Sequence, residues 1–303
     1  MNLREWIQMI SPYRVAYKNY LYVLFKMYTR RKVSSYQNVN IRIRTRNGTK
    51  LVFPYNWVKY YATMCGLKNK NNNDYVSELN INEEGISFKY KNRYVTIDPA
   101  RFSDPYAVFL NEEYSYLEVK SKDVIDVGAN IGDSPIYFAL NGANRVIGLE
   151  PYPYAFQVAE KNVKLNKIDN IVLLNAGYGK DSEIVVDPEK ISGGGSSLVS
   201  SVKGKSIPIF SLRTLINKFN IKEGILKMDC EGCEYAMLDE NDETFNYLEM
   251  IQIEYHYGYE DLVEKLKNCG FDVKFTEPKK SYNPQAENPN MSVGYIYATR
   301  RVQ

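Results

Sequence analysis

The sequence predicts a Rossmann-like α/β fold in its C-terminal part, preceded by an N-terminal α+β extension. From Asp123 onward, short apolar stretches alternate with stretches of helical periodicity, as in a mainly parallel sheet with helices on both faces. Before this point, a basic amphipathic stretch precedes segments that alternate apolar and polar residues. We therefore expect two domains, 1–120 and 121–303.

The C-terminal domain is expected to contain five parallel strands, each followed or preceded by a helix. The strands are placed at Val124–Val127, Arg145–Leu149, Ile171–Asn175, Ile225–Met228 and Met250–Glu254. The helices are placed at Ile131–Leu140, Tyr154–Leu165, Leu212–Phe219, Tyr235–Glu240 and Tyr259–Cys269. The stretches FDVKFTEP and SVGYIYATR predict two final strands joined by a long polar loop.

The N-terminal domain is expected to combine one helix with small antiparallel elements. Ser11-Pro12 resembles a helix start, and tyrosines and leucines recur at helical spacing up to Arg30. Alternating segments around Asn47-Gly48 and Lys91-Asn92 predict two hairpins. The polar run from Lys68 to Asp74 predicts a surface loop.

Charge is distributed unevenly along the 303 residues. The first 60 contain twelve Lys and Arg against the single acid Glu5, whereas the net charge of the whole chain is only +3. Residues 1–60 are therefore expected to contact an anionic membrane or an anionic substrate, and nucleic acid is not expected. A solvated face is the alternative. No signal peptide or long apolar stretch is present, so we expect a cytoplasmic protein, peripheral at the inner membrane surface if the basic arm binds lipid.

A glycine-containing turn follows the first strand of the C-terminal domain. Gly128 and Gly132, flanking Ala129 and Asn130, permit tight turning close to a ligand, and Asp126 adds a polar group at the strand end. A dinucleotide fold would use a third glycine for its pyrophosphate. S-adenosylmethionine has no phosphate, so the turn favours this cofactor.

An acid ends the second strand of this domain, about 20 residues after the glycine turn. The carboxylate of Glu150, which precedes Pro151, can accept hydrogen bonds from both hydroxyls of a ribose. Asn175 and Ala176 end the third strand and are expected to bind the adenine edge. A chance glycine turn with a surface Glu is the alternative interpretation.

Four motifs of the chain resemble the FkbM family of class I methyltransferases. They are D-V-G-A-N-I-G-D at Asp126–Asp133, Glu150-Pro151, Asn175-Ala176, and K-M-D-C-E-G-C-E at Lys227–Glu234. The resemblance covers roughly 123–300. It implies a seven-stranded sheet with an antiparallel last strand, S-adenosylmethionine as methyl donor and, usually, O-methylation.

Two acids at the end of the fourth strand are candidate catalytic residues. Asp229 and Glu231 face the crevice and could orient the acceptor hydroxyl or take its proton, although both also suit a helix start. We assign no metal ion, because a divalent ion there would need further oxygen ligands that the sequence does not identify. Cys230 and Cys233 lack a second C-x-x-C pair and are expected to be packing residues.

His256, the only histidine, follows the fifth strand. An imidazole at this edge could remove the acceptor proton near neutral pH, or it could simply be hydrogen-bonded within the fold. The resembling family often places Glu-x-His at this strand end, which matches Glu254 and His256. The glycine-rich segment Ser192–Ser197 is either a mobile substrate loop or a linker.

Together these features predict an S-adenosylmethionine-dependent methyltransferase that acts on a hydroxyl of a sugar, a lipid-linked glycan or a small metabolite. The first alternative is a nicotinamide-dependent oxidoreductase, which would use the same strand, turn and acid. The second is a non-catalytic protein that binds an anionic surface through its basic arm. Neither the acceptor nor the oligomeric state is predicted by the sequence.

Overall fold

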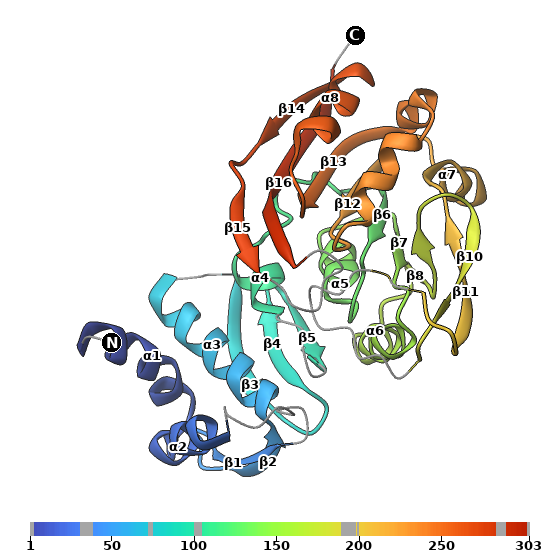
Figure 1. Ribbon diagram of the computed structural model, residues 1–303. Helices are drawn as coiled ribbons and strands as arrows, with labels where there is room; N and C mark the ends of the chain where they lie inside the picture. The colour runs from blue at the N-terminus through green and yellow to red at the C-terminus, as the bar shows by residue number, and fades with distance from the viewer. Residues whose placement is uncertain are drawn as a thin grey trace. The chain divides into compact units, whose positions relative to one another are not determined.

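The computed structural model describes residues 3–30, 39–71, 75–99, 105–188, 198, 200–282 and 289–301 (Figure 1). The chain forms two compact units, Met1–Glu113 and Tyr114–Gln303. Within the described residues, no helix has the length and apolar character needed to cross a membrane. The predicted substrate loop at 192–197 lies outside the described residues.

The first unit begins with two helices where one was predicted. Its helices are α1 (Leu3–Ala16), α2 (Tyr20–Arg30), α3 (Tyr55–Asn71) and α4 (Pro105–Leu110). The predicted start at Ser11-Pro12 is wrong, because α1 runs through both residues. The first helix ends at Ala16 because the backbone then pairs with another extended segment. Lys18 N donates a hydrogen bond to Arg44 O at 2.7 Å.

Two small antiparallel sheets complete the first unit, and both predicted hairpins are confirmed. One sheet pairs β1 (Asn40–Arg44) with β2 (Lys50–Pro54), and the other contains β3 (Val76–Ile81), β4 (Ile86–Tyr90) and β5 (Arg93–Ile97). The predicted loop at Lys68–Asp74 is wrong over 68–71, which continue α3. Residues 72–74 lie outside the described part.

The second unit is built on a twisted sheet in which most strands run parallel (Figure 1). The strand order is β8-β7-β6-β12-β13-β16-β14, and β16 runs antiparallel to both of its neighbours. The strands are β6 (Asp123–Val127), β7 (Arg145–Leu149), β8 (Ile171–Leu174), β12 (Gly224–Met228), β13 (Leu248–Tyr255), β14 (Phe271–Phe275) and β16 (Asn290–Arg300). All seven predicted strands are confirmed, with differences of a few residues at their ends. The additional strand β15 (Lys279–Tyr282) pairs with β16.

Helices cover both faces of this sheet. They are α5 (Asp133–Leu140), α6 (Pro153–Leu165), α7 (Leu212–Phe219) and α8 (Glu260–Asn268), with 3-10 helices η2 (Cys233–Asp239) and η3 (Asp242–Tyr247). Ile125 and Val127 of β6 belong to the apolar core that includes α7 and α8, whereas Asp126, between them, bonds to α5. The helix predicted at 235–240 is a 3-10 helix, η2, that starts at Cys233.

The segment between β8 and α7 forms a small three-stranded sheet that was not predicted from the sequence. It contains β9 (Gly177–Tyr178), β10 (Ser182–Val186) and β11 (Lys205–Phe210), in the order β10-β11-β9. The glycine-rich segment falls between β10 and β11, and it obscured the alternation that would have indicated a hairpin.

Candidate functional site

The glycine turn after β6 lies against the loop that follows β12. Gly128 has φ of +82°, and a Cβ atom there would lie 1.8 Å from the carbonyl oxygen of Asp229. Gly132, with φ of +84°, approaches Ala159 of α6, since a Cβ atom there would lie 3.2 Å from its Cα. The two glycines therefore allow the turn to contact two other segments closely.

A buried ion pair lies directly beneath this turn. Lys227 Nζ is 2.9 Å from Asp126 Oδ1 and donates hydrogen bonds to the carbonyl oxygens of Val127 at 3.3 Å and Gly128 at 2.8 Å. The other oxygen of Asp126 accepts a hydrogen bond from the hydroxyl of Ser134. Asp126, predicted to bind the cofactor, is fully buried, and these contacts make it part of the framework that fixes the turn.

Glu150 is buried at the end of β7, beside the turn. Its two carboxylate oxygens accept hydrogen bonds from the backbone N–H groups of Asn130 at 3.0 Å and Tyr152 at 2.8 Å. Burial raises the pKa of Glu150 to about 8, although both hydrogen bonds oppose this shift. Its predicted contact with a ribose stays a prediction.

Asn175 links the end of β8 to the end of β7. Its side-chain amide donates to the carbonyl oxygens of Glu150 at 2.9 Å and Pro151 at 3.0 Å, and its oxygen accepts from Lys205 Nζ at 2.8 Å. The side chain of the adjacent Ala176 is fully buried. Their predicted contact with adenine is not tested by these bonds, which show that Asn175 positions the two strand ends.

The loop after β12 carries both predicted catalytic acids and takes a left-handed backbone path at Glu231 and Gly232. Glu231 has φ of +59° and Gly232 has φ of +116°. Cys230 and Cys233 pack against the apolar core as expected, and a disulfide bond that the sequence did not predict also joins them. The spacing of the two cysteines permits this short ring once the loop turns back on itself.

Glu234 holds the single histidine beside these acids. Its carboxylate is fully buried; Oε1 lies 2.9 Å from His256 Nδ1 and accepts from the backbone N–H of His256 at 3.0 Å. Its Oε2 accepts from Gly232 N at 2.8 Å. The other ring nitrogen, Nε2, lies 3.2 Å from Glu231 Oε2 and 4.0 Å from Asp229 Oδ1.

The electrostatic surroundings of His256 differ from those expected of a simple base. Burial alone would lower its pKa, but the hydrogen bond to Glu234 and the charges of Glu234, Glu231 and Asp229 together raise the pKa to about 10. The three carboxylates therefore favour the imidazolium form of the ring, a form that cannot accept a proton.

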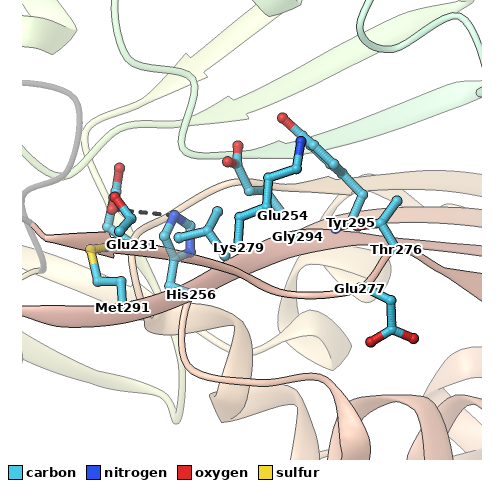
Figure 2. Close-up of a pocket in the computed structure, with 11 residues that line it drawn as sticks. Glu231, Glu254, His256, Thr276, Glu277, Lys279, Met291, Gly294 and Tyr295 are labelled. Carbon is cyan, nitrogen blue, oxygen red and sulfur yellow. Dashed lines mark hydrogen bonds and ion pairs between the residues drawn. The ribbon is translucent and has the colours of Figure 1, made fainter.

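Glu231 and His256 also line a cavity of about 440 Å³ (Figure 2). The other walls come from the end of β13, from 276–281, which include β15, and from β16. The lining residues are Glu231, Glu254, His256, Thr276, Glu277, Lys279, Ser281, Met291, Val293, Gly294 and Tyr295. Three of these residues, Glu231, Glu254 and Glu277, carry carboxylates.

The structure brings the three predicted catalytic residues together, although they follow two different strands. It also adds functional residues that sequence reasoning did not single out. Glu234 was present in the K-x-D-x-E-G-x-E pattern, but its spacing alone did not show that it would reach His256. The cavity walls at 276–281 and 291–295 carried no motif.

The family of the second unit follows from its sequence and its strand order. Residues 126–273 match the family model of the methyltransferase FkbM domain, and this part of the chain is a domain of that family. The sheet has the class I methyltransferase order, with β16 as its antiparallel strand. S-adenosylmethionine is the methyl donor of this class of domain.

Individual relatives are more distant. The chain is similar to ribosomal protein L11 methyltransferase of Alkaliphilus oremlandii, with 27% identity over 154 residues that cover 50% of this chain and 45% of the relative. The chain thus spans less than half the length of the curated relatives that it matches. Among solved structures, it is similar to M. jannaschii TYW2 in complex with AdoMet, at TM-score 0.39 and 18% identity, over 71% of this chain and 86% of that one. It is also similar to Trm5b from Pyrococcus abyssi, at TM-score 0.40 and 14% identity, over 80% and 69% of the respective chains.

The residues around the turn fit S-adenosylmethionine better than a dinucleotide. Asn130 Oδ1 is buried and has no hydrogen-bond partner within the described part of the chain, so it can accept one from a ligand hydroxyl or ammonium. Asp133, in the first turn of α5, is buried where a pyrophosphate would approach. Burial raises its pKa to about 7, against the opposing effect of Lys227. A pyrophosphate at the start of α5 would meet the carboxyl group of Asp133, which argues against a nicotinamide dinucleotide.

Gly128→Ala should destabilise the protein by more than about 2 kcal/mol, because the new Cβ would overlap the carbonyl oxygen of Asp229 as well as strain the backbone. Gly142→Ala is the matched control. Gly142 has φ of +92° but only the side chain and Cα of Lys120 nearby, at 3.5 Å or more, so its replacement should cost about 1 kcal/mol. Urea denaturation of both variants measures the difference, and equal losses would contradict the close contact.

Glu150→Ala should weaken S-adenosylmethionine binding by about 1–3 kcal/mol in calorimetry without unfolding the domain. In the wild type, affinity should rise as the pH increases through about 8, because ribose hydroxyls donate to the carboxylate and the acid form must first lose its proton. The variant should lose this pH dependence. Unchanged affinity in the variant would remove Glu150 from the ribose site.

Proposed function

We propose that the protein is an S-adenosylmethionine-dependent O-methyltransferase whose acceptor is a hydroxyl on a sugar, a lipid-linked glycan or a small metabolite. One observation carries the proposal: a single loop connects the cofactor turn to the acceptor cavity. The Asp229 carbonyl contacts Gly128 of the turn, while Glu231, two residues later, lines the cavity with His256.

The cavity chemistry supports a hydroxylated acceptor. Its volume of about 440 Å³ lies in the range of small-molecule sites. The carboxylates of Glu231, Glu254 and Glu277 accept hydrogen bonds, which suits a ligand with several hydroxyl donors. Thr276 and Ser281 add groups that can both donate and accept.

The proposed reaction is a direct displacement. The cofactor supplies a methyl group bonded to a positively charged sulfur. The acceptor oxygen forms a bond to the methyl carbon as the carbon–sulfur bond breaks, and the electron pair of that bond remains on sulfur. In this proposal Asp229 or Glu231 accepts the hydroxyl proton, which is supported by the position of their carboxylates beside the ring of His256, held by Glu234. Alignment of the oxygen with the methyl group supplies much of the acceleration.

The acceptor can be sought by mass spectrometry of glycans, lipids and metabolites from cells with and without the gene. A product heavier by one methylene group should be present only in cells with the gene, and the purified protein should form it from the unmethylated compound and S-adenosylmethionine. Calorimetric titrations with S-adenosylmethionine and NADH test the class of enzyme. Binding of NADH alone would contradict the proposal.

His256→Ala should lower turnover by about 10²–10⁴-fold while sparing S-adenosylmethionine affinity, because the ring lies on the acceptor side of the site. Lys274→Ala, an exposed change on β14, is the control and should retain full turnover. The pH–rate profile separates the candidate bases, since an imidazole base would place the acidic limb near the pKa of this ring, about 10, and His256→Ala would remove that limb. Wild-type turnover with an unchanged profile in His256→Ala would leave the histidine a structural role.

We also propose that the first unit contacts an anionic membrane surface. Arg42, Arg44 and Lys50 are exposed on one face of the β1–β2 hairpin, and Arg44 is directly opposite Lys50 in the register. Like charges at this spacing destabilise a hairpin, and an anionic surface would remove that cost.

Apolar side chains on α2 strengthen this proposal. Leu21, Phe25 and Tyr28 are 61–74% exposed and lie on one face of the helix, at positions i, i+4 and i+7. Val23 and Met27 are buried on the opposite face. A helix that exposes an apolar stripe beside basic residues suits the interface of an anionic lipid bilayer.

The triple variant Leu21→Ser, Phe25→Ser, Tyr28→Ser should bind vesicles containing phosphatidylserine at least about tenfold more weakly than the wild type in sedimentation assays. The wild-type affinity should fall as salt rises. Deleting α1 and α2 is a poorer test, because Tyr17 is fully buried and donates a hydrogen bond to Val58 O. Val202→Ser, at a fully exposed site of the second unit, is the control. Equal binding by the triple variant and the wild type would argue against lipid contact.

A further inference from the structure

Three side chains, two of which line the cavity, form a potential metal-binding group. Asp229 Oδ1, Glu231 Oε2 and His256 Nε2 all lie within 4.8 Å of one another. Bonds of about 2.0–2.2 Å to a divalent ion would place neighbouring ligand atoms about 3–3.5 Å apart. The observed separations of 3.2 and 4.0 Å from Nε2 to the two carboxylates need only small rotations to reach this geometry.

The histidine is held in the orientation that a metal ligand requires. Glu234 Oε1 contacts both the backbone N–H and Nδ1 of His256, at 3.0 and 2.9 Å, so the proton of a neutral ring is held on Nδ1. The lone pair of Nε2 then faces Asp229 and Glu231. A buried carboxylate behind a histidine is the usual outer-shell partner of histidines that bind metal ions. Glu234 is fully buried, so this partner is built into the fold.

The surroundings suit an ion that also binds a ligand. Glu231 and His256 line the cavity, so an ion held by these side chains would keep coordination positions open toward the acceptor (Figure 2). Two carboxylates with a neutral imidazole carry two negative charges, which match one divalent cation. This ligand set, with one nitrogen and two oxygens, suits first-row ions such as Mn²⁺ or Zn²⁺.

We propose that Asp229, Glu231 and His256 bind one divalent cation at the boundary between the cofactor turn and the acceptor cavity. The sequence assigned no metal because it identified no further ligand beside the two acids, and the fold supplies one, His256, from the end of a neighbouring strand. Resting on the proposed function, the inference adds that the acceptor oxygen binds at an open position of the ion, where the cation favours transfer of the hydroxyl proton to the second, uncoordinated oxygen of Asp229 or Glu231.

The test is a titration of the full-length, untagged and chelator-treated protein with Mn²⁺, followed by the electron paramagnetic resonance signal of the free ion. We expect one equivalent to bind. Asp229→Asn, Glu231→Gln and His256→Ala should each lower the affinity at least about tenfold, and the outer-shell change Glu234→Gln about 10–100-fold. Glu277→Gln, in the same cavity but outside the cluster, should bind Mn²⁺ as the wild type does.

A second measurement uses the wild type alone and so does not depend on how the variants fold. Because His256 is the only histidine of the chain, electron spin echo modulation from an imidazole nitrogen on bound Mn²⁺ can come only from this residue. Absence of Mn²⁺ binding, absence of the nitrogen signal, or binding that the cluster variants leave unchanged would each overturn the proposal.

Calorimetry with S-adenosylmethionine separates the two proposals. Cofactor binding without Mn²⁺ binding would reject the metal site and leave the methyltransferase proposal standing. Mn²⁺ binding without cofactor binding would reject the methyltransferase proposal and leave the metal site standing.

Discussion

The buried ammonium of Lys227 determines the geometry on which the rest of the site depends. It pairs with Asp126 on the neighbouring strand and with two carbonyl oxygens at the start of the glycine turn. An isolated charge inside a protein is strongly unfavourable, so these partners must stay in place for the fold to persist. The same contacts fix the end of β6 relative to β12. Through Ser134, Asp126 also fixes the start of α5, and the turn lies between these three elements.

Regular elements of the second unit could be predicted from sequence because each strand is a short apolar run that ends in a turn residue. The helix α7 (Leu212–Phe219) is identical to its prediction, since Ser211 caps it and Asn220 ends it in the left-handed conformation. Prediction was less successful where tertiary contacts override local preference. Tyr17 and Lys18 have helical spacing, but the backbone of Tyr17 pairs with Thr45, and Lys18 N donates to Arg44 O at the end of β1. Local periodicity carries no information about that partner.

The residues of the candidate site were predictable from the sequence to a similar extent as the helices and strands. Residues that end strands could be named, because the carboxyl ends of parallel strands meet at one edge of a sheet. Contacts that pass between loops could not, and Glu234 is the clearest example, since only the fold shows that it reaches the backbone and ring of His256. The disulfide was missed for a related reason. Two cysteines three residues apart can pair only when the loop between them turns back, and Gly232 permits that turn.

The loop from Asp229 to Glu234 is constrained twice, by the covalent ring between Cys230 and Cys233 and by the hydrogen bond from Gly232 N to Glu234. Its unusual backbone at Glu231 is therefore already formed before any ligand arrives. A site assembled in advance loses little conformational entropy on binding, so more of the interaction free energy is expressed as affinity. Preorganisation of this kind gives a rigid recognition surface, and selectivity among acceptors would then depend on the walls formed by β15 and β16.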